Sequence, residues 1–142
     1  MIFRGIGRRF STQDDAQYEA IGRFWDEMAD KYGRESLSGI GMNWTDNAFD
    51  YAIGRMDGES VEFMDGMQQY EVLLPDKGWE LYSIPLDMLE ETYGIIWQKG
   101  PLSCEIERFS DDGMCCIEIY REQNCPISVK KCGTGVVFPM EK

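Results

Sequence analysis

The segment 116–120, Cys-Ile-Glu-Ile-Tyr, places a carboxylate and a phenol inside a stretch with the pattern of a core strand. Side chains alternate along a strand, so Ile117 and Ile119 share one face while Glu118 and Tyr120 share the other. That second face either meets water, as most glutamates do, or lines a pocket. In the pocket interpretation, Glu118 is a single anionic anchor among aromatic rings.

Such an anchor has a defined chemistry. A carboxylate among rings loses hydration, so its ionised form is costly until a cation pairs with it. Ring faces add roughly 0.5 to 2 kcal/mol each of cation–π attraction when water is excluded. Stacking tolerates many flat scaffolds, so a pocket of this kind accepts a range of aromatic cations.

Other reactive residues narrow the possible chemistry. The chain has no histidine, which excludes Ser-His and Cys-His nucleophilic pairs and leaves Glu, Asp, Tyr, Lys or Cys for catalysis. Its five cysteines include no Cys-x-x-Cys, so neither a disulfide framework nor a metal site is predicted, and no cofactor motif is present. The Gly-Ile-Gly stretches at 5–7 and 39–41 lack the third glycine of a phosphate loop and indicate close packing in strands.

Composition bounds the class of protein. A chain of 142 residues that is 43% hydrophobic is expected to form one globular domain over 1–142. No apolar run is long enough to span a membrane, and the N-terminal residues lack the order of a secretory signal, so we expect a cytoplasmic protein. The net charge of -12 argues against direct nucleic acid binding.

The first half of the chain has the order β-α-β-β. A strand is predicted over 2–10, and a capping box, Thr12-x-x-Asp15, precedes apolar residues at helical spacing up to Gly33. Strands are predicted over 37–44 and 49–56, with a hairpin turn at 45–47. The half-repeat therefore covers 1–56, and 57–69 is taken as the connection.

The second half, 70–142, repeats this order less regularly. Strand-like segments at 70–74 and 79–84 flank a turn or bulge at 75–78, and Asp87-x-x-Glu90 opens a helix that Gly100-Pro101 ends. The segment 104–109 fits a helix turn or a strand, and further strands are predicted over 114–120 and 135–140. Antiparallel strands with helices on one side indicate an α+β fold.

Four motifs in this order resemble a known family. They are Phe-Asp-Tyr-Ala-Ile-Gly at 49–54, Leu-Pro then Gly-Trp-Glu-Leu-Tyr between 74 and 82, Ile-Glu-Ile-Tyr at 117–120, and Val-Val-Phe-Pro-Met at 136–140. Together with the spacing from Trp79 to Glu118, they make the whole chain similar to the GyrI-like small-molecule-binding domain. This family includes the effector-binding domains of AraC- and MerR-type multidrug regulators and has a SOUL/Rob-like α+β fold.

The resemblance implies duplicated β-α-β-β halves related by a pseudo-two-fold axis. It also implies an antiparallel sheet with helices on one side and a ligand cleft on the other. The cleft of the family takes amphipathic, often cationic, aromatic molecules. Carried over by position, Glu118 is the pocket glutamate, and the aromatic walls are Trp79, Tyr51, Tyr82 and Tyr120.

Two features depart from the family pattern. The region 100–113 is irregular where related proteins continue the second helix. The motif Ile-Glu-Arg-Phe at 106–109 competes for the role of the glutamate motif, so Glu107 is the alternative to Glu118, although this register leaves an unusually long tail. Trp25 and Trp97 lie on helical stripes and are expected in the core, and Trp44 is expected to pack on a strand.

Three function classes follow. The first is a stand-alone small-molecule binding protein or sensor, because the chain has no helix-turn-helix pattern. The second is hydrolysis of strained, cyclopropane-containing molecules, as some relatives perform, with Glu118 as general base and Tyr51 positioning the substrate. The third is a protein partnership of the kind implied by relatives that restrain DNA gyrase, carried by the acidic surface.

Overall fold

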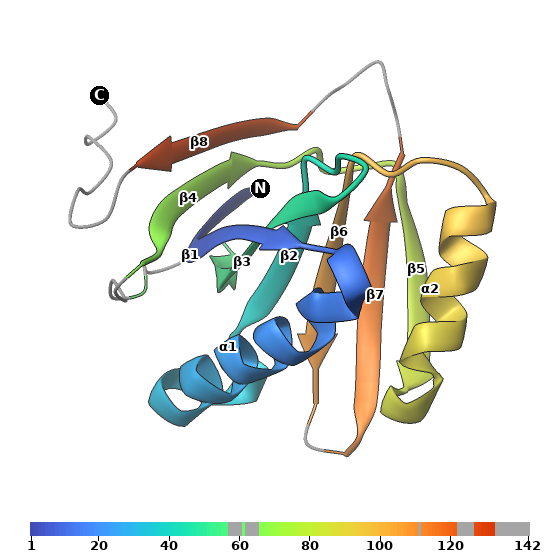
Figure 1. Cartoon of the computed structure of the whole chain (residues 1–142), viewed down its shortest axis with the longest axis horizontal. Helices are drawn as coiled ribbons and strands as arrows, with labels where there is room; N and C mark the ends of the chain where they lie inside the picture. The colour runs from blue at the N-terminus through green and yellow to red at the C-terminus, as the bar shows by residue number, and fades with distance from the viewer. Residues whose placement is uncertain (57–60, 62–65, 111, 122–126, 133–142) are drawn as a thin grey trace.

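The computed structural model describes residues 1–56, 61, 66–110, 112–121 and 127–132. Within them the chain has an α+β fold, with one antiparallel sheet and two α-helices (Figure 1). The helices are α1 (Ala16–Tyr32) and α2 (Leu89–Gln98). The strands are β1 (Ile2–Ser11), β2 (Ser38–Met42), β3 (Ala48–Met56), β4 (Gln68–Leu73), β5 (Trp79–Pro85), β6 (Cys104–Phe109), β7 (Met114–Tyr120) and β8 (Ser128–Cys132).

The strands are ordered β5-β7-β6-β2-β3-β1-β4-β8. Every pair in this order is antiparallel. The junction between β2 and β6 joins segments far apart in the chain, and it brings Gly41 opposite Glu105 and Gly39 opposite Glu107. This junction therefore places β2, the first strand of the β2–β3 hairpin, beside the acidic residues of β6.

Most predicted elements of the first half are confirmed. The helix ends at Gly33, whose φ of 82° is readily adopted by glycine. The backbone N–H of Thr45 donates to the carbonyl of Ala48 at 2.8 Å, which closes the predicted hairpin turn between β2 and β3. The capping box is wrong, because a short 3-10 turn (Gln13–Asp15) precedes α1 and no side chain of Thr12 or Asp15 caps it.

The second half departs further from the sequence prediction. The segment 75–78 is the predicted turn, with bends at 76 and 77, and not a bulge in one bent strand, because β4 pairs with β1 and β8 while β5 pairs with β7. The ambiguous segment 104–109 is a strand, β6, which lies between β2 and β7. The predicted strand at 135–140 lies outside the described residues.

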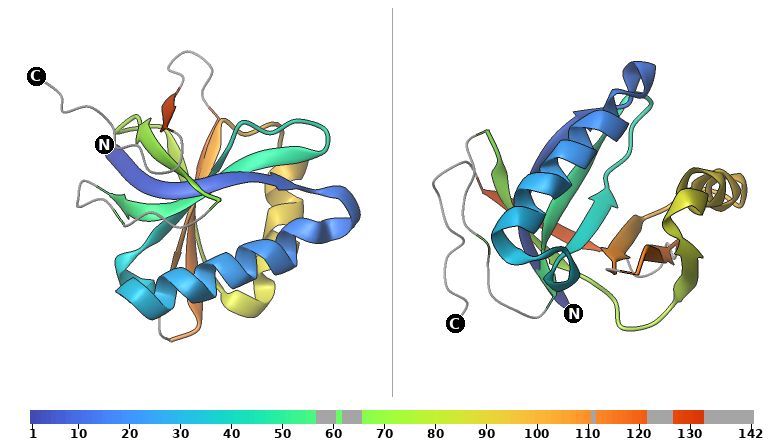
Figure 2. Two further views of the ribbon diagram at one scale, coloured as in Figure 1. Left: turned by 60° about the vertical axis from the view of Figure 1, so that its left-hand side comes forward. Right: turned by 90° about the horizontal axis from the view of Figure 1, so that it is seen from below.

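Both helices lie on the same side of the sheet (Figure 2). Phe24, Trp25 and Met28 of α1 pack on β1 and β3, in a cluster with Ile6 and Tyr51. Helix α2 packs on the other end of the sheet through a cluster that contains Ile96, Ile117 and Ile119. Among the described residues, neither helix is long and apolar enough to cross a membrane.

The opposite face of the sheet has its own apolar cluster. Strands from both halves contribute to it, and its fully buried members include Phe3, Ile40, Ala52, Val72 and Ile106. Because side chains alternate along each strand, a residue of β6 or β7 belongs to one cluster and its neighbour to the other. This alternation decides which acidic residues can face the helices.

Candidate functional site

A cavity of about 670 Å³ lies between α1 and α2, over β3 and β6 in the middle of the sheet. Its walls come from one face of α1, one face of α2 and the 3-10 turns beside them, and its floor comes from β3 and β6. The lining residues are Thr12, Gln17, Tyr18, Ile21, Gly22, Trp25, Asp26, Arg34, Trp44, Phe49, Tyr51, Leu86, Leu89, Glu90, Tyr93, Gly94, Trp97, Glu105, Glu107 and Phe109.

The floor holds two carboxyl side chains two residues apart on β6. Glu105 and Glu107 are 8% and 6% exposed, and alternation along the strand turns both toward the helices. Opposite them on β2 are Gly41 and Gly39, which leave room for the site. A Cβ at Gly39 would lie 2.1 Å from the hydroxyl oxygen of Tyr51, so glycine is required at this position.

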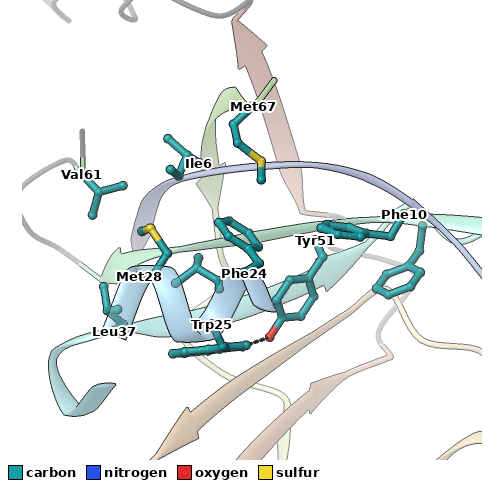
Figure 3. Packing of buried hydrophobic residues seen from close by; sticks show 11 residues of the cluster. Ile6, Phe10, Phe24, Trp25, Met28, Leu37, Tyr51, Val61 and Met67 are labelled. Atoms are coloured by element: carbon teal, nitrogen blue, oxygen red, sulfur yellow. Dashed lines mark hydrogen bonds between the residues drawn. The ribbon is translucent and has the colours of Figure 1, made fainter. Parts of the chain in front are cut away.

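A chain of hydrogen bonds fixes Glu107. The indole N–H of Trp25 donates to the hydroxyl oxygen of Tyr51 at 2.8 Å, as Figure 3 shows. That hydroxyl in turn donates its own proton to Oε1 of Glu107. The hydroxyl of Tyr93, on α2, donates to Oε2 of Glu107 at 2.6 Å. Both oxygens of Glu107 therefore accept a hydrogen bond from a phenol.

Glu105 is in a different situation. Its Oε2 is buried and has no hydrogen-bond partner within the described part of the chain. Its Oε1 lies 2.9 Å from the position of a Cβ at Gly41, so the side chain is closely packed against the floor. A buried acceptor without a partner is rare in folded proteins and calls for an explanation.

Burial and proximity raise the pKa values of these groups. Desolvation, and then repulsion from Glu107, raise the pKa of Glu105 well above its usual value, although the nearby hydroxyl of Tyr93 opposes part of this rise. Desolvation also raises the pKa of Glu107, although the hydrogen bonds from Tyr51 and Tyr93 oppose part of this rise. The pKa values of both phenols are raised well above 10.0, first by desolvation, so they remain neutral donors. The carboxyl pair therefore retains a proton to a higher pH than an exposed glutamate does.

The walls are aromatic and the lining is acidic. Eight aromatic side chains line the cavity: Tyr18, Trp25, Trp44, Phe49, Tyr51, Tyr93, Trp97 and Phe109. Trp44 stacks on Phe49 with ring centroids 5.9 Å apart, and Trp97 meets Trp44 edge to face at 5.2 Å. Four carboxyl groups line the cavity against one guanidinium, Arg34, which donates to Asp26 at 3.3 Å.

The structure places one predicted site residue in this cavity and the others elsewhere. Tyr51 is on the floor, as described above. Glu118 does not line the cavity: it pairs across the strands with Ile106, on the opposite face of the sheet, and forms an ion pair with Arg108. The physical reason is alternation, since Glu118 pairs with Ile106 while its neighbour Ile117 pairs with Glu107.

The remaining predicted wall residues also lie outside the cavity lining. Trp79 and Tyr120 contact each other on the face of Glu118, with ring centroids 5.2 Å apart, and Trp79 donates to the carbonyl of Pro75. Tyr82 lies on the helix face at the edge of the sheet, where its hydroxyl accepts from Lys99 at 3.1 Å. The predicted proximity of Trp79 and Glu118 on one face holds, but that face does not border the cavity.

The cavity itself lies on the helix side of the sheet, whereas the cleft was predicted on the opposite side. The position of α1 over one end and α2 over the other leaves the middle of this face uncovered by helix, and β3 and β6 form its floor. Trp25 is buried in the core and Trp44 packs on Phe49 of β3, as expected, and both also line this space. Trp97 lines it too, but at 40% exposure it is not the core residue that was predicted. The sequence signal that could have found the site is the spacing of Glu105 and Glu107, two residues apart in a segment that alternates as a buried strand does.

Among the described residues, no group of three or more Cys, Asp or Glu side chains is arranged to hold a metal ion. Comparisons with known protein families and with curated proteins returned no match. What bears on function is therefore the cavity and the residues that line it.

Proposed function

We propose that the chain is a small-molecule binding protein or sensor module whose cavity takes amphipathic, cationic aromatic molecules. The observation that supports this most directly is the pair of buried carboxyl groups, Glu105 and Glu107, beneath eight aromatic side chains. The site differs from the one expected around Glu118, but its chemistry is the same.

Two physical effects favour a cation in this cavity. Two carboxyl groups in a desolvated floor cannot both ionise cheaply, and an arriving cation supplies the charge that stabilises the second one. The rings around them supply cation–π attraction of about 0.5 to 2 kcal/mol each and a shape-tolerant stacking surface. A neutral aromatic guest gains only the stacking contacts, so the cavity favours guests with a positive charge.

We also infer that the fold is a duplication of β-α-β-β halves, β1-α1-β2-β3 and β5-α2-β6-β7. The strand order supports this, because β6-β7-β5 on one side of the central junction corresponds to β2-β3-β1 on the other, each read outward from the junction. A pseudo-two-fold axis at the β2–β6 junction would relate α1 to α2. Such an axis explains why equivalent helices flank one cavity.

Thermal unfolding with matched probes tests the binding proposal. The (1-naphthylmethyl)trimethylammonium cation is compared with 1-naphthylmethanol, a neutral molecule with the same ring. We expect the cation to raise the melting temperature more, because it binds the folded state more tightly. The double variant Glu105→Gln/Glu107→Gln should lose most of this gain, since leaving a desolvated charge without its partner costs roughly 2 to 5 kcal/mol.

Glu118→Gln is the matched control, because Glu118 lies outside the cavity. It should retain the full gain in melting temperature. Equal stabilisation by the cation and the alcohol, or an unchanged gain in the double variant, would contradict cation binding at this site.

Hydrolysis of strained electrophilic molecules is the second candidate, and Glu105 is the observation that favours it. A buried glutamate whose pKa is raised by desolvation, with an oxygen that lacks a partner among the described residues, has the environment of a general base acting on water. The discriminating measurement is product formation from an electrophilic cyclopropane, with turnover abolished in Glu105→Gln. Binding of that substrate without turnover would leave only the binding function.

A further inference from the structure

The two carboxyl groups on the cavity floor differ in how their oxygen atoms are hydrogen-bonded. Glu107 accepts a phenol proton on each oxygen, from Tyr51 and Tyr93. Glu105 is more than nine-tenths buried, and its Oε2 has no hydrogen-bond partner among the residues described. The cavity therefore contains one carboxyl group that the protein satisfies and one that it does not.

The nearby protein donors are already committed. The indole N–H of Trp25 is used on Tyr51, and the hydroxyl protons of Tyr51 and Tyr93 are used on Glu107. Arg34, the one cationic side chain of the lining, donates to Asp26, an exposed residue of α1. An N–H group of a guest can supply the donor that Oε2 of Glu105 lacks among the described residues.

We propose that Glu105 makes the cavity selective for protonated amines that carry at least one N–H, over quaternary ammonium ions with the same ring and charge. This inference rests on the proposed function and specifies its ligand class. A quaternary ammonium presents only methyl groups, so it neutralises the charge of Glu105 but leaves its buried oxygen without a hydrogen bond. A primary, secondary or tertiary ammonium satisfies both the charge and the acceptor.

The size of the preference follows from hydrogen-bond energetics. A hydrogen bond to a charged group contributes about 1.5 to 3 kcal/mol, and leaving its buried partner unsatisfied costs a similar amount. Since each 1.4 kcal/mol is a factor of ten in affinity, the N–H cation should bind at least about tenfold more tightly. The difference must come from Glu105, because Glu107 already accepts a hydrogen bond on each oxygen.

The test uses two probes that differ by one methyl group, (1-naphthylmethyl)dimethylammonium and (1-naphthylmethyl)trimethylammonium. Dissociation constants are measured by isothermal titration calorimetry at a pH where the tertiary amine is protonated. The wild type should bind the dimethyl cation at least about tenfold more tightly. Glu105→Met, which replaces the acceptor with an unbranched apolar side chain of similar length, should remove the preference.

Glu118→Gln again serves as the matched control and should retain the preference of the wild type. Equal affinity of the wild type for the two cations would overturn the selectivity while leaving the binding function intact. A preference that survives in Glu105→Met would overturn the assignment to Glu105. Binding of neither cation would overturn the proposed function together with the inference. The comparison within the wild type decides the point even if Glu105→Met does not fold.

Discussion

Replacing Glu105 by glutamine should change how the stability of the protein depends on pH, without any ligand present. Burial and the neighbouring Glu107 raise the pKa of Glu105 well above the value of 4.5 expected in an unfolded chain. Over the pH range between these two values, the folded state keeps a proton that the unfolded chain has released. The free energy of unfolding must therefore decrease as pH rises through this range.

One retained proton corresponds to a slope of about 1.4 kcal/mol per pH unit. The two carboxyl groups interact, so the slope belongs to the Glu105–Glu107 pair. In Glu105→Gln one of the two carboxyl groups of the pair is gone. The variant should match the wild type near pH 4.5 and become more stable relative to it by about 1.4 kcal/mol for each further pH unit, until the pair ionises.

Urea unfolding followed by tryptophan fluorescence at intervals between pH 4.5 and 8 measures this difference directly. Repulsion within a chain of net charge -12 also lowers stability as carboxyl groups ionise, and comparison of the variants cancels this shared contribution. Glu118→Gln is the control, because its ion pair with Arg108 lies outside the cavity. Parallel pH profiles for the wild type and Glu105→Gln would refute the account of a proton held in the floor.

Two further predictions concern packing and an ion pair. Gly39→Ala should lower the free energy of unfolding by about 1 to 3 kcal/mol, because its Cβ would displace the Tyr51 hydroxyl, whereas Gly22→Ala, with open space around it, should raise it by about 0.5 to 1 kcal/mol. Similar effects of the two changes in denaturant titrations would contradict this. Burial alone raises the pKa of Asp50, but hydrogen bonds from three donors lower it below 3.8, so its stabilisation is present above that pH and is lost as pH falls through the folded pKa. Asp50→Asn should therefore lower the free energy of unfolding by about 1 to 3 kcal/mol at pH 7, and by less at acidic pH. Glu19→Gln, on the exposed face of α1, is the control and should change it by almost nothing. A loss of stability in Asp50→Asn that does not shrink as the pH falls would contradict the assignment.

Much of the fold followed from local patterns. Helical spacing of apolar residues before Gly33 predicted α1, and a run of alternating residues around Ile117 and Ile119 predicted β7. Both patterns report burial of one stripe or face, which persists in the tertiary structure. The pairing of β4 and β5 with different partners was not predictable in this way, because strand partners are chosen by long-range contacts.

The candidate site shows the same division. Tyr51 was predicted and lies on the floor, and Glu107 was recognised as the alternative to Glu118. Glu105, Tyr93 and the place of the tryptophans in the cavity lining were missed, because an aromatic residue on a helical stripe has the same local pattern whether it faces a core or a cavity. The distinction depends on how far apart α1 and α2 lie across the sheet.

The sequence by itself determined which residues share a face: Ile117 with Ile119, and Glu118 with Tyr120. It also determined the net charge of -12 and the absence of histidine, which rules out histidine-based catalysis. Only the tertiary structure decided which of the two faces the helices cover, and hence that the buried carboxyl groups of β6 line the cavity. Alternation relates neighbours within a strand, whereas the environment of a face is set by elements that pack on it from elsewhere in the chain.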